Sequence, residues 1–288
     1  EQLLGATYSN LSLTTAGAAE HDRWAARARA TCLERGATAE LVVCLANQST
    51  QLAYSYGDYA GALALLDEAA RLEESEVGRE VFLARFHYIA VFHLVNMDRT
   101  GPAAQRLAEA RRLLERHRAV RDDGSGQYPP FAWAEALLHH ARGEPAEARR
   151  ALATRPHDAL CRELACRLAL EAGEPAAAAE HLTALKGLKG FGIATRARLH
   201  EQVVARLLRA ELLRQTLGTR GEAEPAGNEP APLVAASTEL AAALEGAVEH
   251  TFVPLALEGL VVAAALAPAR FGREPALVAD HPAARYFV

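Results

Sequence analysis

Apolar and polar residues follow the 3.6-residue period of an α-helix along most of the chain, and short glycine-containing turns separate the periodic stretches. The clearest turn is Gly57-Asp58-Tyr59, after which Ala62, Leu66 and Ala69 follow at spacings of four and three. Side chains at these spacings share one helix face, so they are predicted to pack against a neighbouring helix. The same order returns after three other turns: Gly143-Glu144-Pro145 with Ala148 and Leu152, Gly173-Glu174-Pro175 with Ala178 and Leu182, and, more weakly, Asp98 to Gly101 with Ala103, Leu107, Ala110 and Leu113.

Each of these repeats is predicted to be a helical hairpin. Glycine ends one helix in a left-handed turn, and Asp, Glu or Pro suits the first turn of the next helix. One hairpin cannot bury its apolar face alone, so the hairpins are expected to stack into a single all-α domain over residues 1–288, an α-solenoid. Helices are predicted over 3–15, 19–35, 41–55, 80–96, 130–141, 159–171, 195–217 and 233–247 and through Leu266, with irregular loops over 118–130 and 218–232 and capping helices within 233–288.

Charge and cysteine content restrict the partners and the compartment. The chain has 31 Lys and Arg residues against 36 Asp and Glu residues, a net charge of -5, so no basic field attracts phosphates and direct nucleic-acid binding is not expected. The four cysteines form no C-x-x-C pair, which predicts free thiols in a cytoplasmic protein: Cys32, Cys44, Cys161 and Cys166.

The two ends of the chain carry no membrane or secretion signal. The most apolar stretch, Phe252 to Pro268, is shorter than the roughly 20 residues of a membrane span and contains Glu258, so a buried helix is expected there. The N-terminal Glu1 to Leu4 has neither a start methionine nor the layout of a signal peptide. We therefore expect this chain to be part of a longer protein that does not contact the membrane.

Signatures of catalysis and of cofactor binding are missing. There is no G-x-x-x-x-G-K-[ST], G-x-S-x-G or H-E-x-x-H motif, and the glycine-rich stretch Gly187 to Gly192 is expected to be a plain connector. His139 and His140 are adjacent, so their side chains point about 100° apart on a helix and cannot chelate one ion together. The sequence therefore predicts a protein that is not an enzyme and that holds no metal or cofactor.

The glycine turn followed by Ala, a large apolar residue and Ala resembles the second helix of a tetratricopeptide repeat. Gly57 to Leu72 matches best, followed by Gly143 to Leu152 and Gly173 to Leu185. The resemblance implies degenerate repeats stacked in a right-handed superhelix. Three first-helix positions that usually hold Trp, Leu and Gly depart from the family: Ala46, Ser49 and Thr50.

The first helix of each hairpin is expected to line the inner surface of such a stack. Aromatic walls with amide hydrogen-bonding groups would suit a small organic molecule or an extended peptide. The sequence leaves open that the aromatic residues pack against neighbouring helices instead. The candidate ligand-binding residues are Asn47, Gln51 and Tyr54 on one helix, Tyr88 and Phe92, with Asn96, on the next, and Trp133 on the one after.

From about residue 128 onward, five segments occur in a characteristic order: Phe131 to Arg149, the hairpin to Leu185, Leu199 to Leu217, Glu239 to Leu244 and His250 to Ala256. This order resembles the C-terminal half of large ATP-binding transcriptional regulators of the LuxR class, the maltose-regulator type. In that family the repeats lie between a nucleotide-binding module and a helix-turn-helix, and neither flanking part is in this sequence.

The resemblance implies a sensor, in which the repeats bind a small-molecule effector or a regulatory protein and shift the regulator between two states. The alternative is a stand-alone scaffold that mediates protein–protein interaction. A homodimer is left open by either interpretation.

Overall fold

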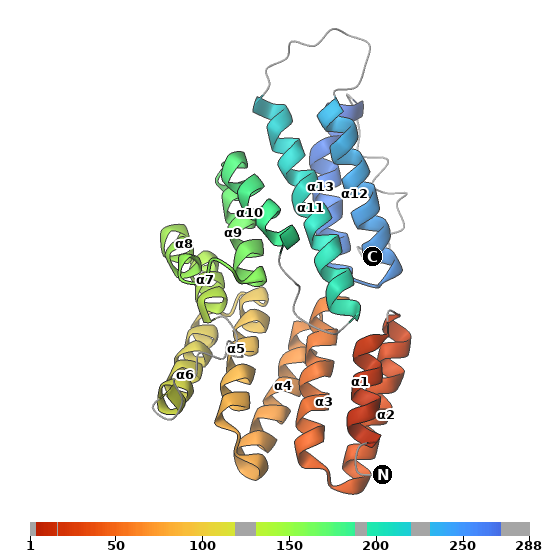
Figure 1. Cartoon of the computed structure of the whole chain (residues 1–288), viewed down its shortest axis with the longest axis vertical. Helices are drawn as coiled ribbons and strands as arrows, with labels where there is room; N and C mark the ends of the chain where they lie inside the picture. The colour runs from red at the N-terminus through yellow and green to blue at the C-terminus, as the bar shows by residue number, and fades with distance from the viewer. Residues whose placement is uncertain (1–3, 16, 119–130, 188–194, 220–230, 272–288) are drawn as a thin grey trace. The chain divides into compact units, whose positions relative to one another are not determined.

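The computed structural model describes residues 4–15, 17–118, 131–187, 195–219 and 231–271, and every secondary-structure element in these ranges is a helix (Figure 1). The all-α class expected from the sequence is confirmed. Contacts divide the chain into two compact units, which are described separately: residues 1–53 with 57–161, and residues 54–56 with 162–288.

The first unit consists of successive helix pairs, in which α1 packs on α2, α3 on α4, α5 on α6 and α7 on α8 (Figure 1). Two of its helices continue into short π-helical turns, labelled η. The elements are α1 (Leu4–Thr14), α2 (Ala18–Arg35), α3 (Thr38–Gln51), η1 (Leu52–Tyr56), α4 (Tyr59–Leu72), η2 (Glu73–Val77), α5 (Glu80–Asn96), α6 (Thr100–Arg118), α7 (Phe131–Ala141) and α8 (Pro145–Ala153). Residues 54–56 of η1 are the exception, since they are grouped with the second unit.

Left-handed backbone conformations end helices at the predicted turns Gly57, Gly143 and Gly173, and also at Gly36 and Gly78, which the sequence analysis does not single out. Positive φ angles recur every 20 or 21 residues in the first part of the unit, at Gly36, Gly57, Gly78 and Asp98. At the predicted turn Asp98 to Gly101, the residue with the left-handed conformation is Asp98 and not the glycine. Asp is one of the few non-glycine residues that tolerate this conformation, because its short polar side chain hydrogen-bonds locally.

Small residues lie at the predicted helix contacts. Ala62, Leu66 and Ala69 are at most 1% exposed, and Leu66 and Ala69 belong to a core that spans α2 to α6. Alanine at such positions lets two helix backbones approach closely, which supports the packing of α4 on α3. The corresponding residues of the other repeats are buried as well: Ala103, Leu107, Ala110, Leu113, Ala148, Leu152, Ala178 and Leu182.

The sequence analysis does not predict the π-helical turns η1 and η2. A π-helix closes its hydrogen bonds over five residues instead of four, so each turn contains more residues than an α-helix and rotates the following side chains. Both turns end at a left-handed glycine, Gly57 after η1 and Gly78 after η2. The predicted helix 41–55 is therefore α-helical only as far as Gln51.

The second unit has its own core, formed by α10 to α13 and the part of α9 after Cys161. Gly259 allows α13 to lie close to α12, because a Cβ atom there would come within 2.6 Å of a Leu244 methyl group. Arg167 of α9 pairs with Glu258 of α13 at 2.5 Å. The elements are α9 (Ala159–Glu171), α10 (Pro175–Gly187), α11 (Thr195–Thr219), α12 (Ala231–Glu249) and α13 (Val253–Phe271).

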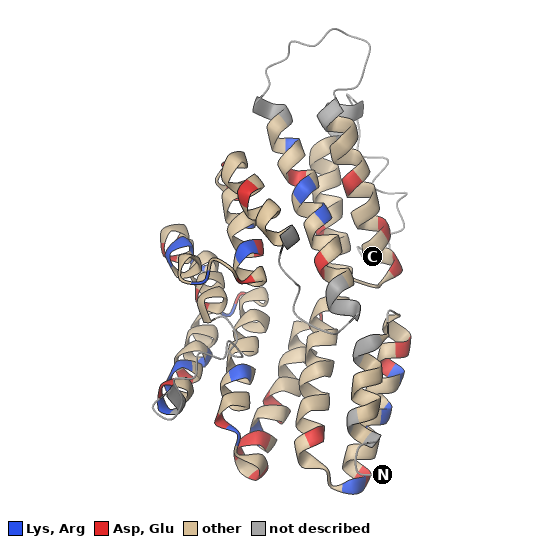
Figure 2. Cartoon of the chain, in the orientation of Figure 1, with Lys and Arg blue, Asp and Glu red and all other residues tan. Residues whose placement is uncertain are grey.

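Acidic and basic residues are mixed along helices such as α6 and α11 (Figure 2). In the part of the chain that the structure describes, no helix combines the length and the apolar character needed to cross a membrane. The predicted loops 118–130 and 218–232 fall mostly outside the described residues, and so does the predicted connector Gly187 to Gly192, apart from Gly187, which ends α10.

Candidate functional site

The predicted amide residues of α3 face the interior of the first unit. Asn47 is half-buried and donates its amide hydrogen to the hydroxyl of Ser9 in α1 at 3.1 Å, which ties the first two hairpins together. Gln51, the last residue of α3, is buried. Tyr54 lies beyond it in η1 and is grouped by its contacts with the second unit. The expected stripe of three residues is thus interrupted by the π-helical turn.

The predicted aromatic residues of α5 and α7 do come together. The ring of Trp133 lies 5.8 Å from that of Tyr88 and 5.6 Å from that of Phe92. Tyr59 of α4 reaches Phe92 at 5.7 Å and Phe131 reaches Tyr88 at 6.0 Å, between ring centroids. These separations are those of favourable aromatic pairs. We call these five residues the aromatic cluster.

The aromatic cluster has a buried layer and a half-exposed layer. Tyr88 is 5% and Trp133 is 9% exposed, so both pack in the interior, as the alternative interpretation of the sequence held. Phe92, Tyr59 and Phe131 are half-buried and present part of their rings to solvent. Neither Tyr59 nor Phe131 was picked out from the sequence as a site residue, although Tyr59 belongs to the glycine turn that defines the best repeat.

A buried polar pair, His93 and Ser49, lies next to the aromatic cluster. His93 is 1% exposed, its Nε2 atom lies 3.1 Å from the hydroxyl oxygen of Ser49 in α3, and its ring lies 5.6 Å from that of Phe92. Burial lowers the pKa of His93 to about 4, so the imidazole is neutral near pH 7. The pair therefore links α3 to α5 through a neutral hydrogen bond.

Asn96, at the end of α5, is exposed and donates its side-chain amide to the carbonyl oxygen of Phe92 in its own helix at 2.8 Å. It closes the last turn of α5 beside the aromatic cluster.

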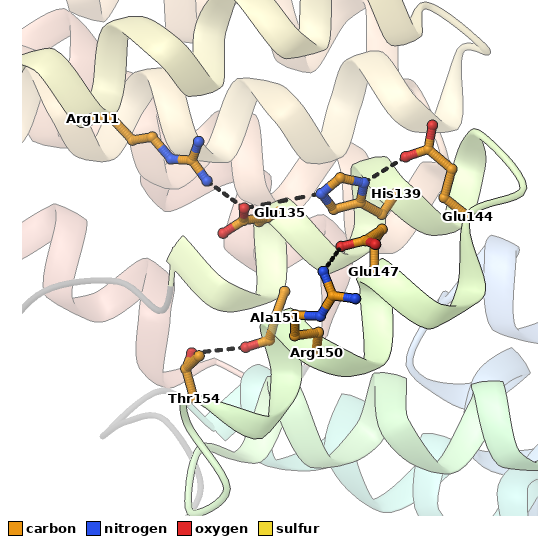
Figure 3. A network of polar contacts seen from close by, with 8 residues as sticks. All are labelled: Arg111, Glu135, His139, Glu144, Glu147, Arg150, Ala151 and Thr154. Atoms are coloured by element: carbon orange, nitrogen blue, oxygen red, sulfur yellow. Dashed lines mark hydrogen bonds and ion pairs between the residues drawn. The ribbon is translucent and has the colours of Figure 1, made fainter.

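A second polar network joins α6, α7 and α8 (Figure 3). Arg111 pairs with Glu135 at 2.5 Å, and the ring of His139 lies between Glu135, at 3.9 Å, and Glu144, at 2.6 Å. His139 is in the last turn of α7 and Glu144 is the N-cap of α8, so the network closes the hairpin turn. Among the residues with described positions, no three or more His, Cys, Asp or Glu side chains are arranged to hold a metal ion.

No protein-family model, curated protein or solved structure matches the chain. What the chain binds must therefore be inferred from its own side chains. The half-exposed rings of the aromatic cluster suit contact with a partly apolar ligand.

Proposed function

We propose that this chain is the effector-binding part of a cytoplasmic LuxR-class transcriptional regulator, built as a right-handed α-solenoid of degenerate tetratricopeptide-like hairpins. Support for the hairpins comes from the left-handed residues between helices and from the buried alanine and leucine positions that follow them. Support for a reducing compartment comes from the four buried cysteines, all free thiols.

The observation that carries the proposal is the half-exposed layer of the aromatic cluster. Tyr59 and Phe92 belong to different helices and meet edge to face, so a ligand that covers both rings contacts α4 and α5 at once. Phe92 rests on Trp133 of α7, which extends the contact to a third helix. A ligand that binds one arrangement of these helices more tightly shifts the protein toward that arrangement, which is what a sensor requires.

Tryptophan fluorescence tests this proposal directly. The chain has two tryptophans, so the Trp24→Phe variant leaves Trp133 as the single reporter, next to Phe92. A panel of oligosaccharides and aromatic metabolites is titrated into this variant. We expect at least one compound to change the Trp133 emission saturably, and Phe92→Ala to weaken its binding by at least about tenfold.

The matched control is Phe82→Ala, which removes the same side chain from the same helix, where Phe82 contacts Phe86 and Arg79 instead of the aromatic cluster. It should leave the affinity unchanged. If no compound changes the emission, and a protein bound to the full chain is lost on Phe92→Ala, the stand-alone scaffold replaces the sensor.

A further inference from the structure

A depression on the first unit lies between the start of α3, the middle of α1 and the residue before α5. It has a volume of about 240 Å³ and opens to solvent. This is smaller than the roughly 300–1,000 Å³ pockets that hold drug-sized ligands, so its occupant is a smaller molecule. It is lined by Ser9, Asn10, Ala39, Glu40, Val43 and Arg79.

Glu40 supplies the negative charge of the depression. It lies in the first turn of α3, is half-buried, and has no hydrogen-bond or ion-pair partner among the described residues. A half-buried carboxylate that makes no hydrogen bond or ion pair keeps its oxygens available as acceptors. It is therefore ready to accept hydrogen bonds from a bound cation.

Arg79 supplies the positive charge, and its orientation is fixed by Glu73. Its backbone amide, Nε and Nη2 all donate to the buried Glu73 carboxylate, at 2.7 to 3.2 Å. The Nη1 atom takes no part in these bonds. Hydrogen bonding to Glu73 raises the pKa of Arg79, and the charge of Glu40 adds to the effect. The guanidinium therefore stays charged, with one edge left to donate to a second carboxylate.

Glu40 and Arg79 line the same depression, yet they form no ion pair with each other. A molecule that carries an ammonium group and a carboxylate a few atoms apart can form an ion pair with each of these two side chains. We propose that the depression binds a free α-amino acid, with the ammonium group on Glu40 and the carboxylate on the Nη1 edge of Arg79. The exposed amide of Asn10 lies at the rim and the hydroxyl of Ser9 in the wall, where it already accepts a hydrogen bond from Asn47.

This site is independent of the aromatic cluster, because the two share no residue. An amino acid bound here contacts α1, the start of α3 and the N-cap of α5. Loss of the proposed amino-acid site would leave the proposed ligand contact at Phe92 untouched, and the reverse also holds.

Isothermal titration calorimetry of the full chain tests the site, with each standard amino acid at about 10 mM, since small ligands of open sites bind weakly. We expect a saturable heat with at least one of them. Its N-acetyl derivative and its methyl ester each lack one of the two charges and should bind at least about tenfold more weakly. The methyl ester tests the contact with Arg79, because it removes the carboxylate that Arg79 would bind. A substitution of Arg79 is not used for this purpose, since it would leave Glu73 buried and unpaired.

Glu40→Gln keeps the shape of the side chain and removes its charge, and it should also weaken binding by at least about tenfold. The matched control is Glu34→Gln, an exposed acid of α2 without a described partner, which should bind as the wild type does. Absence of heat with every amino acid, unchanged binding by Glu40→Gln, or equal binding of the methyl ester would each overturn the proposal.

Discussion

Lowering the pH should destabilise the first unit, because the buried His93 resists protonation in the folded protein. In the folded protein, burial lowers the pKa of this imidazole to about 4, whereas an unfolded histidine titrates near 6.5. Between these two values the unfolded chain binds the proton and the folded protein does not. Stability is therefore fully present above pH 6.5 and is lost as the pH falls toward 4.

The size of the effect follows from the difference between the two pKa values. The free energy of unfolding should fall by about 1.2 kcal/mol at pH 5.5 and by about 2.4 kcal/mol at pH 4.5, relative to pH 7. Burial is the cause of the lowered pKa, and the neighbours that define the site are the Ser49 hydroxyl and the rings of Phe92 and Tyr59. None of them carries a charge that would compensate the imidazolium.

Urea unfolding followed by tryptophan fluorescence measures this quantity for the first unit alone, since Trp24 and Trp133 both lie in it. His93→Gln retains a hydrogen-bonding side chain for Ser49 but does not titrate, so its pH profile should be flatter than that of the wild type by the amounts above. The exposed His157→Gln is the control and should follow the wild type. Parallel profiles for the wild type and His93→Gln would refute the reasoning.

Three further outcomes follow from particular residues. Gly57→Ala should lower the free energy of unfolding by about 1–2 kcal/mol, because φ is +69° there, while Gly101→Ala, inside α6 with open space around the added methyl group, should not lower it; both are measured by urea unfolding. Arg79→Ala should lower the free energy of unfolding by about 3–5 kcal/mol in the same assay, since it leaves Glu73 buried without a counter-ion. A decrease below about 1 kcal/mol would contradict this. Burial raises the pKa of Cys32 to about 12. Iodoacetamide should therefore alkylate Cys32 in the native protein at least about a hundredfold more slowly than free cysteine, as measured by mass spectrometry. Rapid labelling of the native protein would instead show that the thiol is accessible.

The helices could be predicted from the sequence because their signals are local. A glycine in the left-handed conformation stops a helix wherever it occurs, and the period of alanine and leucine then fixes the buried face. The predicted helices 80–96 and 159–171 have the same bounds in α5 and α9, and α8 and α10 begin at the expected prolines, Pro145 and Pro175. The same register placed Tyr88 and Phe92 one turn apart on one face of α5, and both rings contact Trp133.

The π-helical turns and the polar partners could not be predicted in this way. Nothing in the residues 52–56 distinguishes a π-helical turn from an α-helical one, yet the turn changes which face Tyr54 occupies relative to Gln51. The bond from Asn47 to Ser9 joins residues 38 positions apart, and the depression at Glu40 and Arg79 is lined by residues of α1 and α3 and by the residue before α5. Such contacts depend on how helices pack, which a single-sequence pattern does not contain.

Buried polar contacts have a role in this protein that its alanine and leucine contacts cannot fill. The hairpins have similar apolar faces, so burial alone would accept several pairings of one helix with another. A hydrogen bond such as that between Ser49 and His93 forms in one register only, and a shifted pairing would leave His93 buried without it. We infer that this pair fixes α3 against α5, and that the pairing of Glu73 with Arg79 fixes η2 against the start of α5 in the same way. The residues that set the register thus lie beside the two surfaces proposed to bind ligands, so a change of register would alter both surfaces.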